Sequence, residues 1–415
     1  MSDLYEITTH CRACQSPELT SLHDFGMTPL ADRLVRPGTP KQSEPIAPLE
    51  LALCNQCSLV QITAAVDPTV LFGGDYLYFS SVSPSLLKHF TESAQAIIQS
   101  EDINAQSFVF EIASNDGYML KAFKPAGARI LGVDPAKGPA QAAIEAGVPT
   151  VNDFFSRDLA SHLVQEHGEA DVILANNVLA HVYDLEGMVE GIHTMLATTG
   201  VAVIECPYIF DLVEGGEFDT IYHQHLCYFS ATALDKLFER HGLTLADVER
   251  TSIHGGSLRL FVRKSASSPQ RTERLLSLLD SEAQKQVFEA TAYSSLFDLT
   301  ENVARELPKL IRELRASGAS VAGYGAAAKA TTMLAYCGLT SDDLDFIADL
   351  NPRKHGWVMP GGEFEITAPS TLLERKPDYV LILAWNFAKE IMEQQKAYSE
   401  SGGRFIIPLP KPHIV

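Results

Sequence analysis

Residues 106–112 read QSFVFEI, an apolar run containing Glu111, and the turn ASNDG (113–117) and a helical stretch follow. The same succession recurs through the middle of the chain, at 128–136 (ARILGVDPA), 148–155 (VPTVNDFF), 170–182 (ADVILANNVLAHV) and 200–209 (GVAVIECPYI). Strands that alternate with helices predict an α/β fold with a parallel, doubly wound sheet. Ligands of such sheets bind at the carboxyl ends of the strands, so the turns after these runs are the first candidates for a site.

The composition predicts an acidic, soluble protein. The 415 residues are 46% hydrophobic, which is enough for two or three domains with cores of their own. The formal net charge is −20 and no run of four Lys or Arg occurs, which argues against nucleic acid or an anionic membrane as a partner. The first residues, MSDLYEITTHC, do not resemble a secretory signal, and no stretch of eighteen apolar residues is present. We therefore expect a cytoplasmic protein.

Four of the seven cysteines form two Cys-x-x-Cys pairs near the N-terminus, namely Cys11 and Cys14 (CRAC) and Cys54 and Cys57 (CNQC). Each pair turns two thiolates toward one point, and four thiolates suit a tetrahedral zinc ion with no open position for water. The pattern predicts a structural zinc site. A redox-active CxxC is the alternative, although such a motif normally occurs once. The remaining cysteines lie among apolar neighbours and are predicted to be core residues: Cys206, Cys227 and Cys337.

The turn after the first apolar run has features of a nucleoside-binding site. Gly117 allows the backbone to approach a ligand closely. Asp134, 23 residues after Glu111, ends the second strand, where a carboxylate can accept both hydroxyls of a ribose. The turn lacks the three glycines that receive a pyrophosphate, so a cofactor with a ribose and no phosphate fits it, and S-adenosylmethionine is such a cofactor. The alternative is a domain without a cofactor, whose acidic residues only cap helices.

A dense group of imidazole and phenol side chains lies in DTIYHQHLCYFS, residues 219–230. Its members are Tyr222, His223, Gln224, His225 and Tyr228. The preceding GGEF is a turn signal, so we expect a loop or the end of a short strand. Histidine is suited to moving a proton near neutral pH, and tyrosine can donate to a developing oxyanion. Zinc ligation by the two histidines and a purely structural pair are the alternatives. His254, in a Gly-containing turn downstream, is a candidate for the same cavity.

A second strand–turn–helix pattern occurs in SVAGYGAAAKATTML, residues 320–334. Gly323, Gly325 and Ala328 match the GxGxx(G/A) dinucleotide fingerprint, and Asp349 lies 24 residues beyond Gly325. NAD is therefore one hypothesis for this turn. Free amides at the helix N-terminus, together with Lys329, would also bind the phosphates of a nucleotide sugar. The third hypothesis is that these glycines bind no ligand and only allow close packing.

Three motifs stand in order along the chain: the paired CxxC knuckles, the turn EIASNDG (111–117), and IYHQHLCYFS (221–230) followed by GYGAAAK (323–329). In this order they resemble the S-adenosylmethionine-dependent C-methyltransferases of deoxysugar biosynthesis, which act on dTDP-linked keto-sugars in antibiotic pathways. The resemblance spans essentially the whole chain. It implies three domains: a zinc-binding domain (1–70), a doubly wound methyltransferase domain (71–268), and a Rossmann-like domain (269–415) that holds the nucleotide sugar rather than NAD.

The resemblance also implies roles for individual residues. At the reacting centre these are His225 as the base, Tyr222 beside the sugar, Tyr76 (in GGDYLYFSS) reaching into the same cavity, and His181. At the cofactor they are Glu111, Ser114, Asn115, Gly117, Asp134 and Asn177. One position departs from the family, which often reads HEH where this chain reads HQH. Gln224 carries no charge, so the substrate and the acceptor atom stay open at this point.

Together these observations predict an S-adenosylmethionine-dependent C-methyltransferase. The resemblance implies that the acceptor is the carbon next to the ketone of a nucleotide-linked deoxy keto-sugar. Methylation of such a carbon needs a base to remove its proton and a donor to the enolate oxygen. The predicted diphosphate site comprises the amides of Gly325, Ala326 and Ala327 and the side chain of Lys329. Asp349 is expected only to cap local backbone. An O- or N-methyltransferase, an NAD-dependent oxidoreductase and a non-catalytic nucleotide-sugar-binding module are the alternatives.

Overall fold

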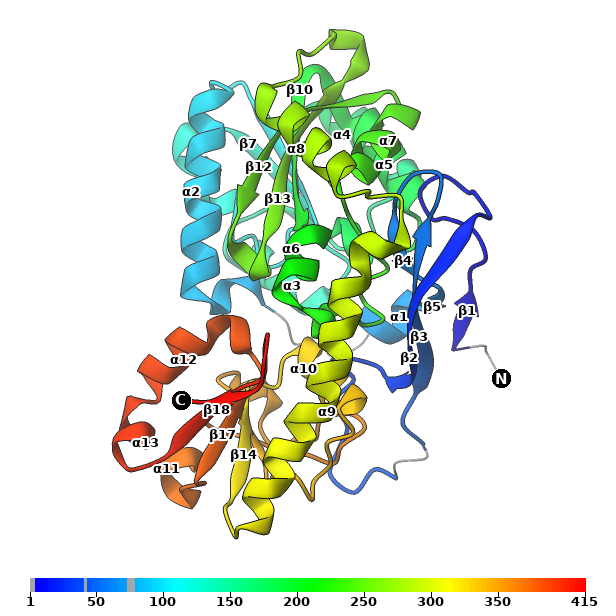
Figure 1. Cartoon of the computed structure of the whole chain (residues 1–415). Helices are drawn as coiled ribbons and strands as arrows, with labels where there is room; N and C mark the ends of the chain where they lie inside the picture. The colour runs from blue at the N-terminus through cyan, green and yellow to red at the C-terminus, as the bar shows by residue number, and fades with distance from the viewer. Residues whose placement is uncertain (1–3, 41–42, 73–78) are drawn as a thin grey trace.

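The computed structural model describes residues 4–40, 43–72 and 79–415. Figure 1 shows three parts: a small β part formed by the N-terminal strands, a central α/β part, and a C-terminal α/β part, with the long helix α9 (Ser294–Ala316) running beside the last two. Among the helices of these residues, none combines the length and the apolar character that a bilayer crossing demands.

The N-terminal part is antiparallel. Its strands are β1 (Tyr5–Ile7), β2 (Leu19–Pro29), β3 (Ile46–Cys54), β4 (Val60–Ile62) and β5 (Ala64–Val66), followed by α1 (Pro68–Phe72). β2, β3 and β4 pair in sequence, and β1 pairs with β5. A further strand, β11 (Cys227–Tyr228), joins this sheet beside β4. The N-terminal sheet therefore includes two residues of the segment that the sequence predicts to react.

The central part contains a seven-stranded sheet in the order β12-β13-β10-β9-β6-β7-β8. Its parallel strands are β6 (Phe108–Ile112), β7 (Arg129–Val133), β8 (Thr150–Val151), β9 (Ala170–Asn176) and β10 (Leu196–Pro207). All residues of β6 are buried, as expected for a strand covered on both faces. The predicted doubly wound sheet is confirmed. β8 is shorter than the predicted strand at 148–155, because the chain is exposed from residue 152 to 154 and leaves the sheet.

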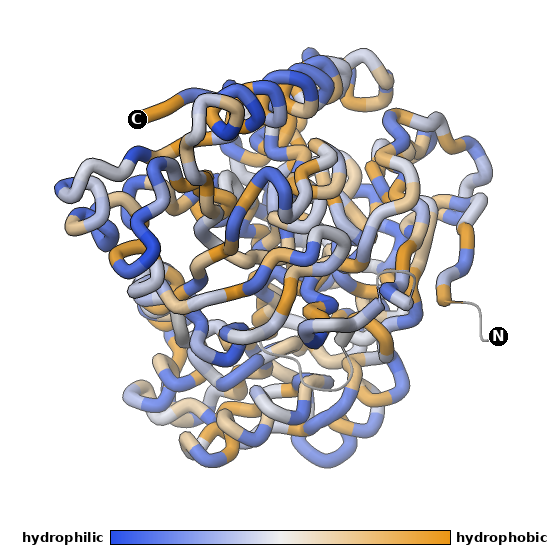
Figure 2. The backbone as a smooth tube through the Cα atoms, turned by 90° about the horizontal axis from the view of Figure 1, so that it is seen from below, coloured by the Kyte–Doolittle hydropathy of each residue, from blue (hydrophilic) through white to orange (hydrophobic). Residues whose placement is uncertain are grey.

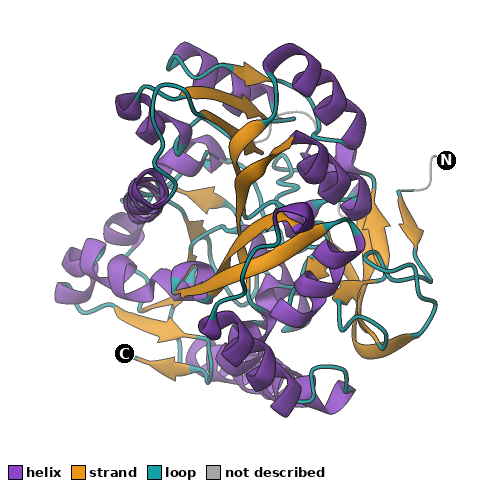
Figure 3. Cartoon of the chain, turned by 90° about the horizontal axis from the view of Figure 1, so that it is seen from above, coloured by secondary structure: helices purple, strands orange, loops and turns teal. Residues whose placement is uncertain are grey.

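Helices and one antiparallel hairpin complete the central part. The helices are α2 (Pro84–Ser100), α3 (Lys137–Glu145), α4 (Arg157–His167), α5 (Leu185–Met195), α6 (Ile209–Gly215) and α7 (Ala231–Arg240). The hairpin comprises β12 (Leu243–Thr251) and β13 (Ser257–Lys264), and β13 is antiparallel to β10 as well. Figure 3 shows the strands inside and the helices around them.

The C-terminal part contains a six-stranded sheet in the order β16-β15-β14-β17-β18-β19. The strands are β14 (Val321–Tyr324), β15 (Ile347–Ala348), β16 (Ile366–Thr367), β17 (Tyr379–Ile382), β18 (Arg404–Ile407) and β19 (His413–Ile414). All pairs are parallel except β18 with β19, which confirms the predicted Rossmann-like fold. The helices that accompany them are α10 (Ala328–Tyr336), α11 (Thr371–Arg375), α12 (Ala388–Gln394) and α13 (Lys396–Glu400). Hydrophilic and hydrophobic segments alternate along the outer helices in Figure 2.

Helix α8 (Glu273–Gln284) packs with the central part, although the predicted division at residue 268 assigns it to the C-terminal domain. It contacts α7 and β12. Its Glu282 is fully buried and accepts hydrogen bonds of 2.7 Å from the amides of Ala231 and Thr232 at the start of α7. The first amides of a helix have no partner within it, so this carboxylate satisfies them and ties α8 to the central sheet.

Candidate active site and metal centre

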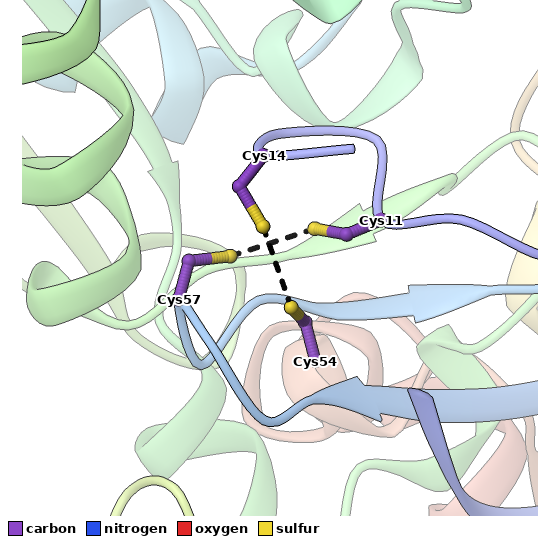
Figure 4. A group of neighbouring side chains, drawn as sticks. All are labelled: Cys11, Cys14, Cys54 and Cys57. Carbon is purple, nitrogen blue, oxygen red and sulfur yellow. Dashed lines mark hydrogen bonds between the residues drawn. The ribbon is translucent and has the colours of Figure 1, made fainter. Parts of the chain in front are cut away.

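The sulfur atoms of Cys11, Cys14, Cys54 and Cys57 all lie within 4.8 Å of one another and point toward a common centre (Figure 4). The Sγ–Sγ distance is 3.5 Å for Cys11–Cys57 and for Cys14–Cys54. Thiolates at about 2.3 Å from a tetrahedral zinc ion lie about 3.8 Å apart, so the cluster fits zinc. Within the part of the chain that is described, it is the one cluster of side chains with metal-ligand spacing. Four sulfurs leave no position for a reacting water, and the zinc is structural.

The N-terminal sheet holds the 222–228 segment in place. The amide of Ile62 donates to the carbonyl of Leu226 at 3.1 Å, next to the β4–β11 pair. His223 is fully buried and donates from Nε2 to the carbonyl of Pro48 in β3, also at 3.1 Å. Burial lowers the pKa of His223 to about 4, so the ring is neutral. His223 therefore joins the segment to the zinc-binding part, and the structural reading of this histidine is the one that fits its contacts.

The cofactor turn lies where β6, β7 and β9 end. Both oxygens of Asp134 accept backbone hydrogen bonds, from the amide of Asn115 at 2.8 Å and from that of Ala136 at 2.9 Å. Each carboxylate oxygen keeps a second lone pair. Asp134 also lines a cavity at these strand ends, described below, so it can still accept hydrogen bonds from the hydroxyls of a ribose. Burial raises the pKa of Asp134 to about 6. The residue fits its predicted role toward S-adenosylmethionine.

Three residues predicted at the cofactor do not line the cavity, namely Glu111, Ser114 and Gly117. Glu111 is fully buried. One of its oxygens accepts from Nδ2 of Asn176 at 3.4 Å, the other has no partner among the described residues, and burial raises its pKa well above the ordinary value. A Cβ on Gly117 would lie 2.9 Å from the side chain of Val148, and its φ is +71°. Gly117 thus serves the shape and packing of the turn, where close approach to a ligand was predicted.

Left-handed backbone marks the rim of this turn. Ala113, Asn115 and Asn177 have φ of +54°, +49° and +53°, and all three line the cavity. Such conformations cost about 1–3 kcal/mol each in non-glycine residues and concentrate where a ligand is bound. Asn115 and Asn177 were predicted from the family motifs. Ala113 carries no chemical signal in the sequence, because only the folded backbone shows its conformation.

A cavity of about 1500 Å³ lies between the three parts. It is lined by residues 32–34 of the N-terminal part, by the cofactor turn, by Tyr222 and His225, and by the C-terminal turn. The predicted cavity between the two doubly wound domains thus also has a wall from the zinc-binding part. Among the described residues, three of the lining side chains have a buried polar atom without a hydrogen-bond partner: Oδ1 of Asn177, Nε2 of Gln224 and Oδ1 of Asn386. Unpartnered buried polar atoms favour a polar ligand in this space.

His225 is held as a neutral base in this cavity. Its Nδ1 donates to the carbonyl of Thr220 at 2.8 Å, which fixes the hydrogen on Nδ1, so Nε2 accepts from the hydroxyl of Tyr222 at 3.1 Å. Desolvation, with help from His181 and His254, lowers the pKa of His225 to about 3. His181 lies beside it, with ring centroids 4.7 Å apart, and donates from Nδ1 to the carbonyl of Gln224 at 2.7 Å.

The structure brings His181, Tyr222, His225 and His254 to the same cavity. His254 was expected there only from the glycines beside it. Tyr76 lies outside the described residues. Neither His223 nor His225 belongs to the cluster with metal-ligand spacing among the described residues, which consists of the four cysteines.

The C-terminal turn differs from the predicted phosphate cradle. The amide of Gly325 donates to the carbonyl of Ala348 at 2.8 Å, and the amide of Ala326 donates to Oδ2 of Asp349 at 2.7 Å. The prediction that these two amides face a phosphate is therefore wrong, because the neighbouring strand end already occupies them. Asp349 also accepts from the amide of Asn351 at 2.7 Å, which confirms that it caps local backbone.

Lys329 has neighbours that the sequence does not indicate. Its Nζ lies 4.1 Å from the ring centroid of Trp385, and Nε1 of Trp385 donates to Oδ2 of Asp219 at 2.7 Å. Asp219 is fully buried, and Glu217, almost fully buried, lines the cavity. Burial raises the pKa of Glu217 to about 8. In the sequence these two acids belong to GGEFDT, which indicates only a turn.

Three family models match successive parts of the chain: a zinc-binding domain at residues 11–72, a methyltransferase domain at 89–248, and a C-methyltransferase C-terminal domain at 252–410. The C-methyltransferase NovU of Streptomyces niveus is 34% identical over 415 residues, covering 100% of this chain and 99% of that protein. Two solved structures are more distant. Magnesium protoporphyrin IX methyltransferase of Synechocystis is 17% identical (43% of this chain, 83% of that chain, TM-score 0.35). The 1,6-didemethyltoxoflavin-N1-methyltransferase of Burkholderia thailandensis is 21% identical (42% and 78%, TM-score 0.32).

Proposed function

The chain belongs to the S-adenosylmethionine-dependent C-methyltransferases with an N-terminal zinc-binding domain, and we propose that it methylates a carbon next to the ketone of a nucleotide-linked deoxy keto-sugar. One observation carries this proposal. His225 is a neutral imidazole with a fixed tautomer, and its Nε2 accepts a hydrogen bond from the hydroxyl of Tyr222. Both side chains line the cavity that the cofactor turn also lines. A carbon next to a ketone needs such a base, because it becomes nucleophilic only after it loses a proton.

In the proposed reaction, the C–H bond next to the ketone breaks and its proton passes to Nε2 of His225. The electron pair moves into the enolate, and the hydroxyl of Tyr222 turns from Nε2 to donate to the enolate oxygen. When bound, S-adenosylmethionine would supply the electrophilic methyl group: the electron pair of the enolate carbon would form the new C–C bond, and the pair of the broken C–S bond would stay on sulfur. Desolvation keeps His225 in its base form, and a nucleoside diphosphate in the same cavity would raise the pKa of His225 and strengthen the base.

The size and the polarity of the cavity support a nucleotide sugar as the second ligand. Sites for one small ligand usually enclose about 300–1,000 Å³, so a cavity of about 1500 Å³ has room for the cofactor and an acceptor together. The unpartnered atoms of Asn177, Gln224 and Asn386 suit the hydroxyls of a sugar. With the amides of Gly325 and Ala326 occupied, the first free amides of α10, from Ala327, and the exposed Arg33 are the groups on the cavity wall that suit a diphosphate.

The test is incubation of the protein with methyl-labelled S-adenosylmethionine and a panel of nucleotide keto-sugars. We expect label on a carbon next to the carbonyl, located by NMR. Label on an oxygen or a nitrogen would contradict the enolate, and transfer only to acceptors without a nucleotide would contradict the substrate class.

A further inference from the structure

Lys329 belongs to a group of buried and partly buried side chains from three separate segments. It lies in the first turn of α10, against the ring of Trp385, whose Nε1 donates to Asp219. Oδ2 of Asp219 takes that hydrogen bond, while Oδ1 is buried with no hydrogen-bond partner among the described residues. The ammonium of Lys329 and the carboxylates of Asp219 and Glu217 are close enough to shift one another's pKa. Lys329 is therefore held in place at the cavity wall, unlike a mobile surface lysine.

The helix that carries Lys329 also contacts the segment that carries the base. Thr332, one turn further along α10, donates to the carbonyl of Ile221 at 2.8 Å. On one side of Ile221, the carbonyl of Thr220 fixes Nδ1 of His225. On the other side, Tyr222 donates to Nε2 of the same ring. One face of α10 thus rests on the backbone that positions the base.

Electrostatic coupling also indicates that Lys329 lies near the base. Lys329 lowers the pKa of His254, and His254 lowers that of His225, so these groups lie within range of one another. All three line the cavity. A diphosphate placed at Lys329 would bring two full negative charges next to the carboxyl group of Asp219, before any reaction takes place. A ketone oxygen carries little charge until the proton leaves, so it suits this position better than a phosphate does.

We propose that Lys329 is a catalytic residue, whose ammonium group donates a hydrogen bond to the ketone oxygen and stabilises the negative charge that develops there as the enolate forms. Asp219 and Trp385 are positioning residues for that ammonium. Lys329 keeps its proton throughout, so the only proton transferred is the one that His225 removes from carbon. The inference rests on the proposed function and adds to it the charged donor that faces the reacting oxygen.

The experiment measures the first half of the reaction by itself. The probes are thymidine-diphosphate-linked keto-sugars in deuterated buffer without S-adenosylmethionine, and the readout is exchange of the hydrogen next to the ketone, followed by NMR. We expect Lys329→Met to slow this exchange about 10²–10³-fold, the usual cost of removing an oxyanion donor. Calorimetric affinity for thymidine diphosphate should stay within about threefold of the wild type, since the lysine does not hold phosphate. Lys389→Met, an exposed lysine of α12, is the matched control and should leave both values unchanged.

A second variant separates catalysis from folding. Asp219→Asn removes a carboxylate that raises the pKa of Lys329. The titratable groups that face Lys329 are Asp219 and Glu217 from the 217–220 turn and His254 from the turn before β13. The alkaline limb of the exchange rate should therefore move to lower pH in Asp219→Asn, a change that a merely structural role would not produce.

Each outcome decides between the two proposals. If Lys329→Met exchanges the hydrogen as fast as the wild type, or loses much of its affinity for thymidine diphosphate, Lys329 does not have the proposed role. The proposed function is then unaffected. An unmoved alkaline limb in Asp219→Asn also overturns it. A wild-type protein that methylates its acceptor without any exchange next to the ketone contradicts the enolate mechanism, and the role of Lys329 falls with it.

Discussion

If Asp134 binds the ribose of S-adenosylmethionine, we expect the affinity for this cofactor to depend on pH near neutrality. Burial raises the pKa of this carboxyl to about 6 from an ordinary value of 3.8, with the amides of Ala136 and Asn115 acting in the opposite direction. The ionised fraction of such a group falls from about 90% at pH 7 to about 9% at pH 5. A protonated carboxyl loses most of its capacity to accept from ribose hydroxyls. We therefore expect the Kd to rise about tenfold over this interval.

The same raised pKa affects the stability of the cofactor-free protein in the opposite direction to the cofactor affinity: stability falls as the pH rises. A carboxyl whose folded pKa is raised binds its proton more readily in the folded protein, so the cofactor-free protein loses stability as the pH rises from about 4 to about 6. A pKa of about 6 in place of 3.8 corresponds to roughly 3 kcal/mol of folding free energy. Bound S-adenosylmethionine offsets this loss, and its effect on the melting temperature should be larger at pH 7 than at pH 5.

Titration calorimetry with S-adenosylmethionine at several pH values between 5 and 7 checks both points. In Asp134→Asn the affinity should be weaker and independent of pH, because the amide does not titrate. Asp158→Asn, an exposed acid at the start of α4, should follow the wild type. A flat wild-type profile, or the same slope in Asp134→Asn, would refute the assignment of Asp134 to the cofactor.

Three further outcomes follow from the contacts around the base and the metal. His225→Ala should lower turnover about 10²–10⁴-fold, the usual cost of a lost general base, with S-adenosylmethionine affinity retained in calorimetry; near-normal turnover would remove His225 from its role. Cys57→Ser should reduce bound zinc, measured by metal analysis, and destabilise the N-terminal sheet that carries β11; full zinc content would contradict the four-sulfur site. His223→Ala removes the hydrogen bond to the partly buried carbonyl of Pro48, a loss of about 1 kcal/mol, and should lower both the unfolding midpoint and kcat. An unchanged kcat would mean that this contact does not position His225.

The family and the fold were predictable because their signals are local. Two residues between paired cysteines are enough to aim both thiolates at one point, and apolar runs separated by helices are enough to predict parallel sheets. The motif order that resembles sugar C-methyltransferases agrees with the C-methyltransferase matches across the chain. The NAD-dependent oxidoreductase and the non-catalytic module, open on the sequence alone, do not agree with them.

The tertiary structure decided which groups are left to meet a ligand. In the sequence, Gly325 and Ala326 look like free phosphate donors, but the end of β15 and Asp349 take their hydrogens, and Glu111 lies behind the cavity it was expected to line. In the sequence, Lys329 looks like a cation that binds phosphate. In the structure it lies beside Asp219 and Trp385, which are 110 and 56 residues away along the chain. The spacing of residues along the chain fixes the direction of neighbouring side chains. The partner of each donor or charge depends on packing between distant segments, and no short stretch of sequence contains that information.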